Sequence, residues 1–483
     1  MPSETRPQRI RDPIHNLIEF GTDQFEQMLW RVIQTPTFQR LRRIRQLGFS
    51  EFVYPGATHT RFAHSIGVFH VARQLVRIIE QRRGVSSAHH REHQADVALA
   101  AALVHDIGHG MFSHAMEAIG RKLNLPFYDH EVVGKRLVIE TEIAREFEVL
   151  GRGFATDVVE AVKDGRPRDL YAAVVSSQFD ADRLDYIQRD RLMAGVESSG
   201  IDATWLLSNL ETYAVRTGTD AEEAGVVETL VLGRKAFHVA ESYVLSLFHL
   251  YPNVYFHKAT RAAEKIFAAL VLRLIDLARE GQGDKTALPP RHLLLRFAKA
   301  PEDFALCTAL DDAVFWGALP MLEEADDLVI AGHARSLLRR QLPKCVDVRR
   351  RLEEAVPPVV NAGPEAMKER AARLRALSDT VIERFEAWAA DRPPGSTPIY
   401  VDQVNRQPYK KRKSTDLQSP LDQILIRLGE GEPLDMADIS PVVANAASFE
   451  GCRAYVTRGD TASEAMLGNI IRTTVQEERH VGA

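Results

Sequence analysis

Apolar positions recur at the three- and four-residue spacing of α-helices along most of this chain. Between Phe25 and Leu47 the pattern continues across Pro36, a residue that can begin a new helix, and that helix should place Gln46 at its end. Two further helices are predicted over about Ser65 to Arg82 and about Gln94 to Val104. The second is nearly all apolar and should be buried. The spacing therefore predicts a mainly α protein.

The pattern changes near the C-terminus. Helical spacing extends from about Lys258 to about Ala389, and the run DRPPGST at Asp391–Thr397 then breaks helix. Short β-branched and aromatic runs mixed with turns follow, and these predict a small α/β appendage. Because 483 residues exceed what one hydrophobic core usually serves, we expect a core over residues 1–265, a helical extension over 266–390 and a small α/β C-terminal region over 391–483.

Composition excludes several classes of protein. Apolar residues make up 45% of the chain, charged residues 26%, and the net charge is −5, so the chain as a whole is not attracted to nucleic acid or to anionic membranes. The first residues resemble no signal peptide, and the longest apolar run, Val97–Val104, is too short to span a bilayer. We expect a cytoplasmic protein that has no membrane partner and for which nucleic acid is a possible but not a favoured ligand. Three scattered cysteines indicate neither disulfides nor a thiolate zinc site.

Histidines are concentrated in one part of the chain, with ten of the 17 between His59 and His130. A lone buried histidine usually just hydrogen-bonds a carbonyl, but a whole set beside an aspartate favours a metal centre. Imidazoles and carboxylates together suit a divalent ion that keeps a reactive water. The candidate ligands are His64, His105, Asp106 and Asp182. The sequence therefore predicts a metal-dependent phosphohydrolase.

The run FDADRLDYIQRD combines several acids and a phenol. In a helix, Asp182, Tyr186 and Asp190 would lie on one side, since they are four residues apart. For Asp185 and Arg189 a solvent-exposed charged face with a four-residue ion pair is a reasonable interpretation.

These segments closely resemble the HD-domain deoxynucleoside triphosphate (dNTP) triphosphohydrolases, a dNTPase and dGTPase family whose members include the sterile-alpha-motif and HD-domain dNTPase. The matching runs are DPIHNLIEF, TPTFQRLRRIRQLG, YPGATHTRFAHSIGV, HDIGHGMFSH, DHE and DADRLDYIQRD. They extend from Asp12 to about Lys258, with a weaker match through the C-terminal part. The resemblance implies an HD-domain helical phosphohydrolase core over 1–265 that hydrolyses dNTPs to deoxynucleoside and inorganic triphosphate.

The resemblance also implies a role for each matching residue. The metal ligands are again His64, His105, Asp106 and Asp182, and the ion is divalent: manganese, magnesium, iron, nickel or zinc. The catalytic proton-transfer group consists of His109, His114, Glu117, His130 and Glu131, with His130 as the preferred general acid. The substrate-binding group consists of Gln46, Leu47, Arg61, Arg183, Tyr186, Asp190 and Tyr255. Within it Arg61 is expected to meet a phosphate, and Arg183 replaces a lysine of the relatives.

Two departures from the family pattern keep other functions open. Leu247 occupies the place of a phosphate-binding arginine, and Gln34 that of an acidic residue which reads the activator base in GTP-regulated relatives. The alternative is another HD phosphohydrolase, such as a nucleotidase, a cyclic-nucleotide phosphodiesterase or a single-strand nuclease. A non-catalytic nucleotide sensor is a third hypothesis, which the proton-transfer group disfavours.

The last predictions concern partners. The resemblance implies a homo-oligomer, a tetramer or larger, with a nucleotide activator at a subunit interface. The basic run Lys410–Lys413 fits either a solvent-exposed loop or a polyanion site of that kind.

Overall fold

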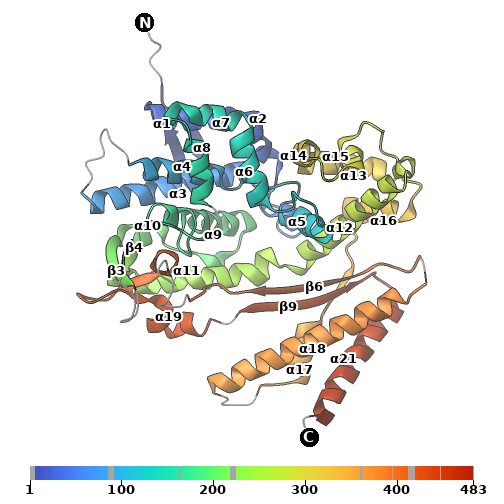
Figure 1. Ribbon diagram of the computed structural model, residues 1–483. Helices are drawn as coiled ribbons and strands as arrows, with labels where there is room; N and C mark the ends of the chain where they lie inside the picture. Colours follow the sequence, from blue (N-terminus) through green and yellow to red (C-terminus); the bar gives the residue numbers. More distant parts are fainter. Residues whose placement is uncertain are drawn as a thin grey trace.

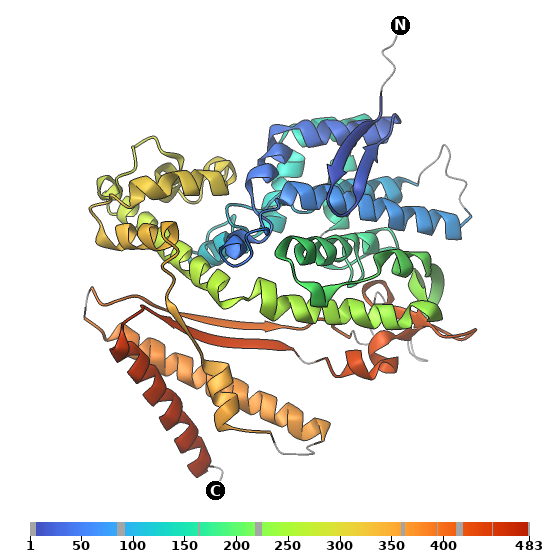
Figure 2. The same cartoon turned by 180° about the vertical axis from the view of Figure 1, so that it is seen from behind.

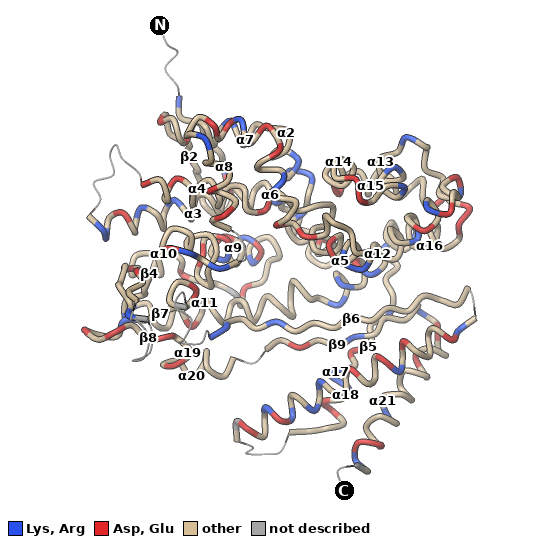
Figure 3. Tube along the Cα trace, viewed as in Figure 1, with Lys and Arg blue, Asp and Glu red and all other residues tan. Residues whose placement is uncertain are grey.

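The computed structural model of this chain describes residues 6–84, 92–162, 165–217, 225–358, 363–393, 395–411, 419–446 and 448–481. Arg412 and Lys413 of the predicted basic run lie outside these residues. Helices dominate the architecture, so the predicted mainly α class is confirmed (Figure 1). Acidic and basic residues are both spread along the trace rather than separated into different parts of it (Figure 3). No helix among the described residues has the length and apolar character needed to cross a membrane.

Three packed helices build the core around the histidine-rich segment: α3 (Arg61–Arg82), α4 (His93–Val104) and α9 (Ala181–Ala194). The predicted helices over 65–82 and 94–104 correspond to α3 and α4. Helix α3 begins at Arg61 because the Thr60 side chain caps the Ala63 amide. Helix α4 is buried over nearly its whole length, as its apolar run predicts.

The helix predicted to start at Pro36 is shorter than expected. Pro36 does begin α2 (Pro36–Gln39), after α1 (Gln24–Gln34), but a 3-10 turn follows at Arg40–Arg43 and the backbone is extended at Ile44. Gln46 therefore lies beyond the helix, where its backbone N–H donates to the His59 carbonyl oxygen. Pairing of this segment with the residues before α3 replaces the last helical turn.

The remaining elements of the N-terminal half surround these three helices. A hairpin of β1 (Gln8–Asp12) and β2 (Asn16–Phe20) precedes α1. The helices are α5 (His114–Lys122), α6 (His130–Glu140), α7 (Glu142–Phe147), α8 (Phe154–Ala161) and α10 (Ala203–Ser208). Strands β3 (Leu210–Thr217) and β4 (Gly225–Gly233) form an antiparallel pair that β7 (Leu425–Arg427) and β8 (Leu434–Asp435) extend. The C-terminal part thus returns to the core.

A long, nearly continuous helical path connects the halves of the molecule. It consists of α11 (Phe237–Leu250), one π-helical turn over Tyr251–Tyr255 and α12 (Lys258–Arg279). A second hydrophobic core forms between α12 and the helices after it, which are α13 (Leu293–Lys299), α14 (Phe304–Ala309), α15 (Asp312–Leu322) and α16 (Leu328–Leu338). The domain boundary expected after residue 265 falls inside α12, and the division into three regions remains a prediction.

The C-terminal part contains a three-stranded antiparallel sheet in the order β5 (Lys344–Asp347), β9 (Phe449–Val456), β6 (Ile399–Arg406). The prediction of helices from about 258 to about 389 is wrong at β5, because Cys345 and Val346 pair with β9, a partner about 110 residues away that local spacing cannot reveal. Strands β6 and β9 run as a long ribbon along α12, with α18 on the opposite side (Figures 1 and 2). The helices of this part are α17 (Val348–Ala355), α18 (Pro364–Ala390), α19 (Met436–Ile439), α20 (Pro441–Ala444) and α21 (Thr461–Val481).

Candidate metal centre and active site

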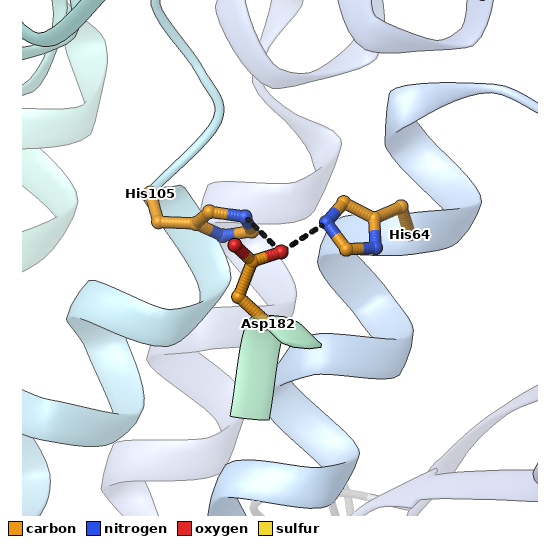
Figure 4. Close-up of side chains that lie close together, drawn as sticks. All are labelled: His64, His105 and Asp182. Atoms are coloured by element: carbon orange, nitrogen blue, oxygen red, sulfur yellow. Dashed lines mark ion pairs between the residues drawn. The ribbon is translucent and has the colours of Figure 1, made fainter. Parts of the chain in front are cut away.

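Three of the predicted metal ligands meet where the core helices converge (Figure 4). His64 lies near the start of α3, His105 directly follows α4, and Asp182 lies in the first turn of α9. The Asp182 Oδ1 atom is 2.9 Å from His64 Nε2 and 3.7 Å from His105 Nε2. Each ligand is attached to the end of a buried helix, so the backbone holds the group in place before any ion binds.

The outer nitrogens of both imidazoles are engaged, which directs the inner nitrogens toward Asp182. His64 Nδ1 lies 2.8 Å from Asp185 Oδ2, and His105 Nδ1 lies 2.9 Å from the Ala102 carbonyl oxygen. Both Nε2 atoms are buried and face the Asp182 carboxylate, with which each forms an ion pair. A divalent cation would use both nitrogen lone pairs and the carboxylate oxygen. The group therefore fits a metal with nitrogen and oxygen ligands.

The protonation of this group depends on the carboxylates around it. Burial lowers the pKa of His64, but Asp182 and Asp185 outweigh that effect and raise it to about 10. The pKa of His105 is raised as well, because the carboxylates of Asp106 and Asp182 outweigh its burial. A cation competes with these protons for the same nitrogens, so affinity for the ion should depend on pH.

Asp106, the fourth predicted ligand, lies at the edge of this group. Its Oδ2 atom is 3.7 Å from His64 Nε2, and its Oδ1 atom is 3.5 Å from His105 Nε2. The Arg61 guanidinium pairs with the same carboxylate and also donates to Ser113 Oγ at 2.8 Å. Burial would raise the pKa of Asp106, but Arg61 and His105 hold it well below its usual value. Asp106 is thus an ionised carboxylate within reach of the same ion.

The interpretation of Asp185 and Arg189 as a solvent-exposed face is wrong. Both side chains are fully buried, and Arg189 Nε donates to Asp185 Oδ2 at 2.7 Å. Asp185 also accepts from the His15 ring at 2.6 Å, while Arg189 donates to Asp12 at 2.8 Å. The pair faces inward because α9 packs on α3 at Gly67, where a Cβ atom would lie 2.0 Å from Asp185 Oδ1.

This buried network is the part of the site that sequence reasoning missed. Spacing of four residues between an acid and an arginine is the same on an exposed and on a buried helix face, so the pattern could not decide. The signal for this network is the run DPIH at Asp12 to His15, which places two polar side chains in the N-terminal hairpin. Taken by itself, that run indicates only the family resemblance.

A second group of titratable side chains lies beside the first. Glu117 Oε1 is 2.7 Å from His130 Nδ1 and 3.6 Å from His109 Nδ1, and Glu117 Oε2 is 3.1 Å from His114 Nδ1. The rings of His109 and His130 stack with their centroids 3.9 Å apart. Gly108 permits this approach, because a Cβ atom there would lie 1.9 Å from the His130 carbonyl oxygen. His109 Nε2 is 3.3 Å from Asp106 Oδ1 and so connects the two groups.

The charges in this second group are well defined. Burial would raise the pKa of Glu117, but hydrogen bonds with His114 and His130 lower it. Burial would lower the pKa of His130, and its interaction with Glu117 raises it instead. Both shifts favour an imidazolium beside a carboxylate, an arrangement that can deliver a proton. Glu131, the other predicted member, is exposed and lies outside the part of the cavity wall that the described residues form.

Both groups open into one cavity of about 630 Å³. Most of the predicted substrate-binding side chains line it: Gln46, Leu47, Arg61, Tyr186, Asp190 and Tyr255. Arg183 is absent from that wall and lies 3.9 Å from Asp180, which caps the start of α9. Leu247 is buried in the hydrophobic core rather than in the cavity wall.

One side of the cavity carries polar groups arranged for a hydroxylated ligand. The Tyr255 hydroxyl donates to Asp190 Oδ2 at 2.8 Å, and His59 Nε2 lies 2.8 Å from Asp190 Oδ1. The Tyr186 ring lies edge-on to the Tyr255 ring with centroids 6.2 Å apart. Gln46 Oε1 is buried and lacks a partner among the described residues, so it is an acceptor that a ligand can use.

Comparison with known proteins identifies the family. The HD domain model matches residues 61–188, the span that contains all four candidate metal ligands, and the model of the HD associated region matches residues 222–288. The chain is 30% identical over 339 residues to the uncharacterized protein YwfO of Bacillus subtilis, a match covering 70% of this chain and 71% of that protein. The chain belongs to the HD-domain phosphohydrolase family.

More distant relatives of this HD-domain protein carry a named activity. The deoxynucleoside triphosphate triphosphohydrolase SAMHD1 of Gallus gallus is 28% identical over 394 residues, which cover 74% of this chain and 58% of the chicken protein. The match to the chicken enzyme thus leaves two-fifths of that enzyme without a counterpart. A further relative, the uncharacterized protein MJ1154 of Methanocaldococcus jannaschii, is 31% identical over 269 residues, which are half of its length.

Solved structures support the same fold. A phosphohydrolase from Bacteroides thetaiotaomicron superposes with a TM-score of 0.65 at 24% identity, covering 93% of this chain and 99% of the other. A hypothetical protein from Aquifex aeolicus superposes with a TM-score of 0.64 at 21% identity, covering 97% and 100% of the two chains. The mainly α fold is therefore shared with these two solved structures over nearly the whole chain.

Proposed function

We propose that this HD-domain protein is a metal-dependent dNTP triphosphohydrolase that releases deoxynucleoside and inorganic triphosphate. The observation that carries the proposal is the single cavity that joins three features: the His64–His105–Asp182 group, the His130–Glu117 pair and the polar wall around Asp190. Activity of this kind is named for the SAMHD1 relatives. We further propose that all four predicted ligands, with Asp106, hold one divalent ion.

The proposed chemistry divides between the ion and the side chains. A divalent ion held by His64, His105, Asp106 and Asp182 would acidify a water and withdraw charge from a phosphoryl oxygen. The leaving 5′ oxygen requires a proton, and His130 carries one because Glu117 stabilises its charged form. Stacking against His109 holds the His130 ring in place. His130 is accordingly the proposed general acid, and Glu117 its positioning residue.

The polar wall is proposed to hold the deoxyribose. Gln46 Oε1 is a free buried acceptor for a 3′-hydroxyl, and Asp190, fixed by Tyr255 and His59, offers a second. The Tyr186 and Tyr255 rings would pack against the sugar, where an added 2′-hydroxyl needs room that tightly packed rings do not provide.

One observation favours a second candidate, another HD phosphohydrolase acting on a monophosphate or diester. Leu247 is part of the hydrophobic core, so α11 presents no cation to a triphosphate at that position. The two candidates differ in product. Homo-oligomerisation and a nucleotide activator at a subunit interface remain further proposals, and sedimentation with and without GTP would test them.

A product assay separates these candidates. Purified protein with manganese would be incubated with all four dNTPs, with and without the matching ribonucleotides, and the products resolved by chromatography. Deoxynucleoside together with intact triphosphate supports the proposed function. Orthophosphate, monophosphate or no turnover by protein with bound metal would contradict it and favour the second candidate.

A further inference from the structure

The C-terminal strand β6 forms part of the catalytic cavity wall, although it lies more than 200 residues after α9. Gln403, Val404, Asn405 and Arg406 all line the cavity. Strand β6 pairs with β9 along its whole length and lies beside α12 in both views (Figures 1 and 2). The proposed active site is therefore completed by the C-terminal part of the chain.

A buried ion pair fixes which face of β6 is turned to the cavity. Asp402 is only 2% exposed and accepts from Arg261 Nε of α12 at 3.0 Å. Gln403, the next residue, also borders the cavity, but its side-chain amide donates to Asp379 of α18 at 2.8 Å, on the opposite side of the strand. Because side chains of a strand alternate between faces, Arg406 points to the same side as Asp402, toward α12 and the cavity.

The position of the Arg406 guanidinium agrees with this alternation. Its central carbon lies 5.9 Å from the centre of the Phe256 ring, and Phe256 lines the cavity. The charge of Arg406 also acts on Tyr251, another residue of the cavity wall. Burial raises the pKa of the Tyr251 hydroxyl, and the positive charges of Arg183 and Arg406 oppose that shift. The side chain thus reaches the aromatic rim of the cavity.

Arg406 differs from the other arginines of the wall in having no carboxylate partner among the described residues. Arg61 pairs with Asp106, Arg261 pairs with Asp402 and Glu264, and Arg121 lies 3.9 Å from Glu117. Within the part of the chain that the structure describes, the only hydrogen bond recorded for the Arg406 side chain goes to the Asn405 carbonyl oxygen, 3.2 Å away. A cation without a carboxylate partner among the described residues, at the rim of the cavity that carries the candidate metal ligands, is placed for an anionic ligand.

We propose that Arg406 binds the distal phosphates of the nucleotide substrate, and that Asp402 is the positioning residue that holds β6 against α12 for this purpose. The inference rests on the proposed function, since it assigns the recognition of the triphosphate at that same site. A guanidinium can donate two parallel hydrogen bonds to phosphoryl oxygens, which suits a terminal phosphate. In this chain α11 carries the buried Leu247 at the place of the phosphate-binding arginine of the relatives. Arg406 of the C-terminal sheet would supply the cation instead.

Kinetics of two Arg406 variants would test the assignment. We expect Arg406→Met to raise KM for dNTPs by about 10- to 100-fold, the loss associated with a charge-assisted hydrogen bond, with a small change in kcat. Inhibition by inorganic triphosphate should weaken by a similar factor, and Arg406→Lys should restore part of it. Hydrolysis of bis(p-nitrophenyl) phosphate, which has no distal phosphates, and bound metal should stay at wild-type values. KM within twofold of wild type in Arg406→Met would overturn the proposal.

Two controls keep the test decisive. Arg472→Met removes an exposed arginine of α21, whose side chain donates to Asn469, and should change neither KM nor inhibition. If wild-type protein cleaves no dNTP, the proposed function fails, but calorimetric binding of inorganic triphosphate still tests Arg406. Binding weakened in Arg406→Met and intact in Arg472→Met supports the assignment, and equal binding by both overturns it.

Discussion

The Asp185 carboxylate lies 2.8 Å from Nδ1 of His64 and so determines which nitrogen of that imidazole faces the metal group. The same carboxylate accepts from His15 and Arg189, and both it and Arg189 are fully buried. Such an outer carboxylate orients a metal-binding histidine and strengthens it as a ligand. Asp185 therefore belongs to the candidate metal centre although it is not one of the predicted ligands.

We expect Asp185→Asn to weaken metal binding by about 10- to 100-fold, because the amide no longer favours a proton on His64 Nδ1. Titration with manganese at a temperature where the variant is folded would measure this. The matched control is a surface pair in which His93 Nε2 lies 2.9 Å from Asp157 Oδ2 and both side chains are exposed. Asp157→Asn should leave the affinity as it is. Equal affinities in the two variants would show that Asp185 has no role at the ion.

Gly67 should be essential for stability. A Cβ atom at this position would lie 2.0 Å from Asp185 Oδ1 and 2.4 Å from Arg189 Nη2, so α3 and α9 must separate or the buried pair must break. We expect Gly67→Ala to lower the free energy of unfolding by about 3 kcal/mol or more, the scale of overpacking and of a disrupted buried ion pair. Urea denaturation followed by circular dichroism would measure the loss.

Gly317 provides the contrast for that measurement. It is exposed in α15 and a Cβ atom there would meet nothing within 4 Å. Gly317→Ala should stabilise the protein by about 0.5 to 1 kcal/mol through helix propensity alone. Similar effects of the two substitutions would mean that the close approach of α3 and α9 is unimportant.

Local motifs predicted the candidate ligands, three of which the fold brings together, but not the side chains that support them. His105 and Asp106 are adjacent in sequence, and His64 and Asp182 lie in runs whose chemistry is visible without a fold. Arg406 and Asp185 owe their positions to tertiary packing: one to the pairing of β6 with β9, the other to the contact of α9 with α3. Spacing along one segment carries no information about either.

The fold shows the same division. Apolar spacing placed α3 and α4 to within a few residues, since each helix buries its own periodic face. It missed β5, whose pairing depends on β9, and it extended the helix after Pro36 past Ile44, where pairing with the residues before α3 takes over. Local rules thus failed where a distant segment supplies the hydrogen bonds.

The pH dependence of turnover should report the His130–Glu117 pair. A general acid is active while protonated, so kcat should fall as pH rises through the pKa of His130, which Glu117 raises. Glu117→Gln removes the negative charge, lowers that pKa and should move the alkaline limb of the profile to lower pH. Profiles of kcat for the two proteins, with metal content measured at each pH, would show the shift. An unmoved limb would exclude His130 as the group that titrates.

Gln46 should recognise the 3′-hydroxyl of the substrate. Its Oε1 atom is buried in the cavity wall and lacks a partner among the described residues, so wild-type protein should prefer a dNTP over the 2′,3′-dideoxy analogue. Gln46→Leu removes the acceptor while keeping a side chain of similar volume. We expect kcat/KM for the dNTP to fall by about 10-fold or more and the value for the dideoxy analogue to change little, because only the first compound loses a hydrogen bond.

Gln188→Leu on α9 is the matched control, since Gln188 bonds to the Leu184 carbonyl of its own helix and lies outside the cavity wall. If Gln46→Leu lowered kcat/KM equally for both compounds, the side chain would serve the shape of the cavity rather than the 3′-hydroxyl, and the sugar would have to be held from the Asp190 side alone.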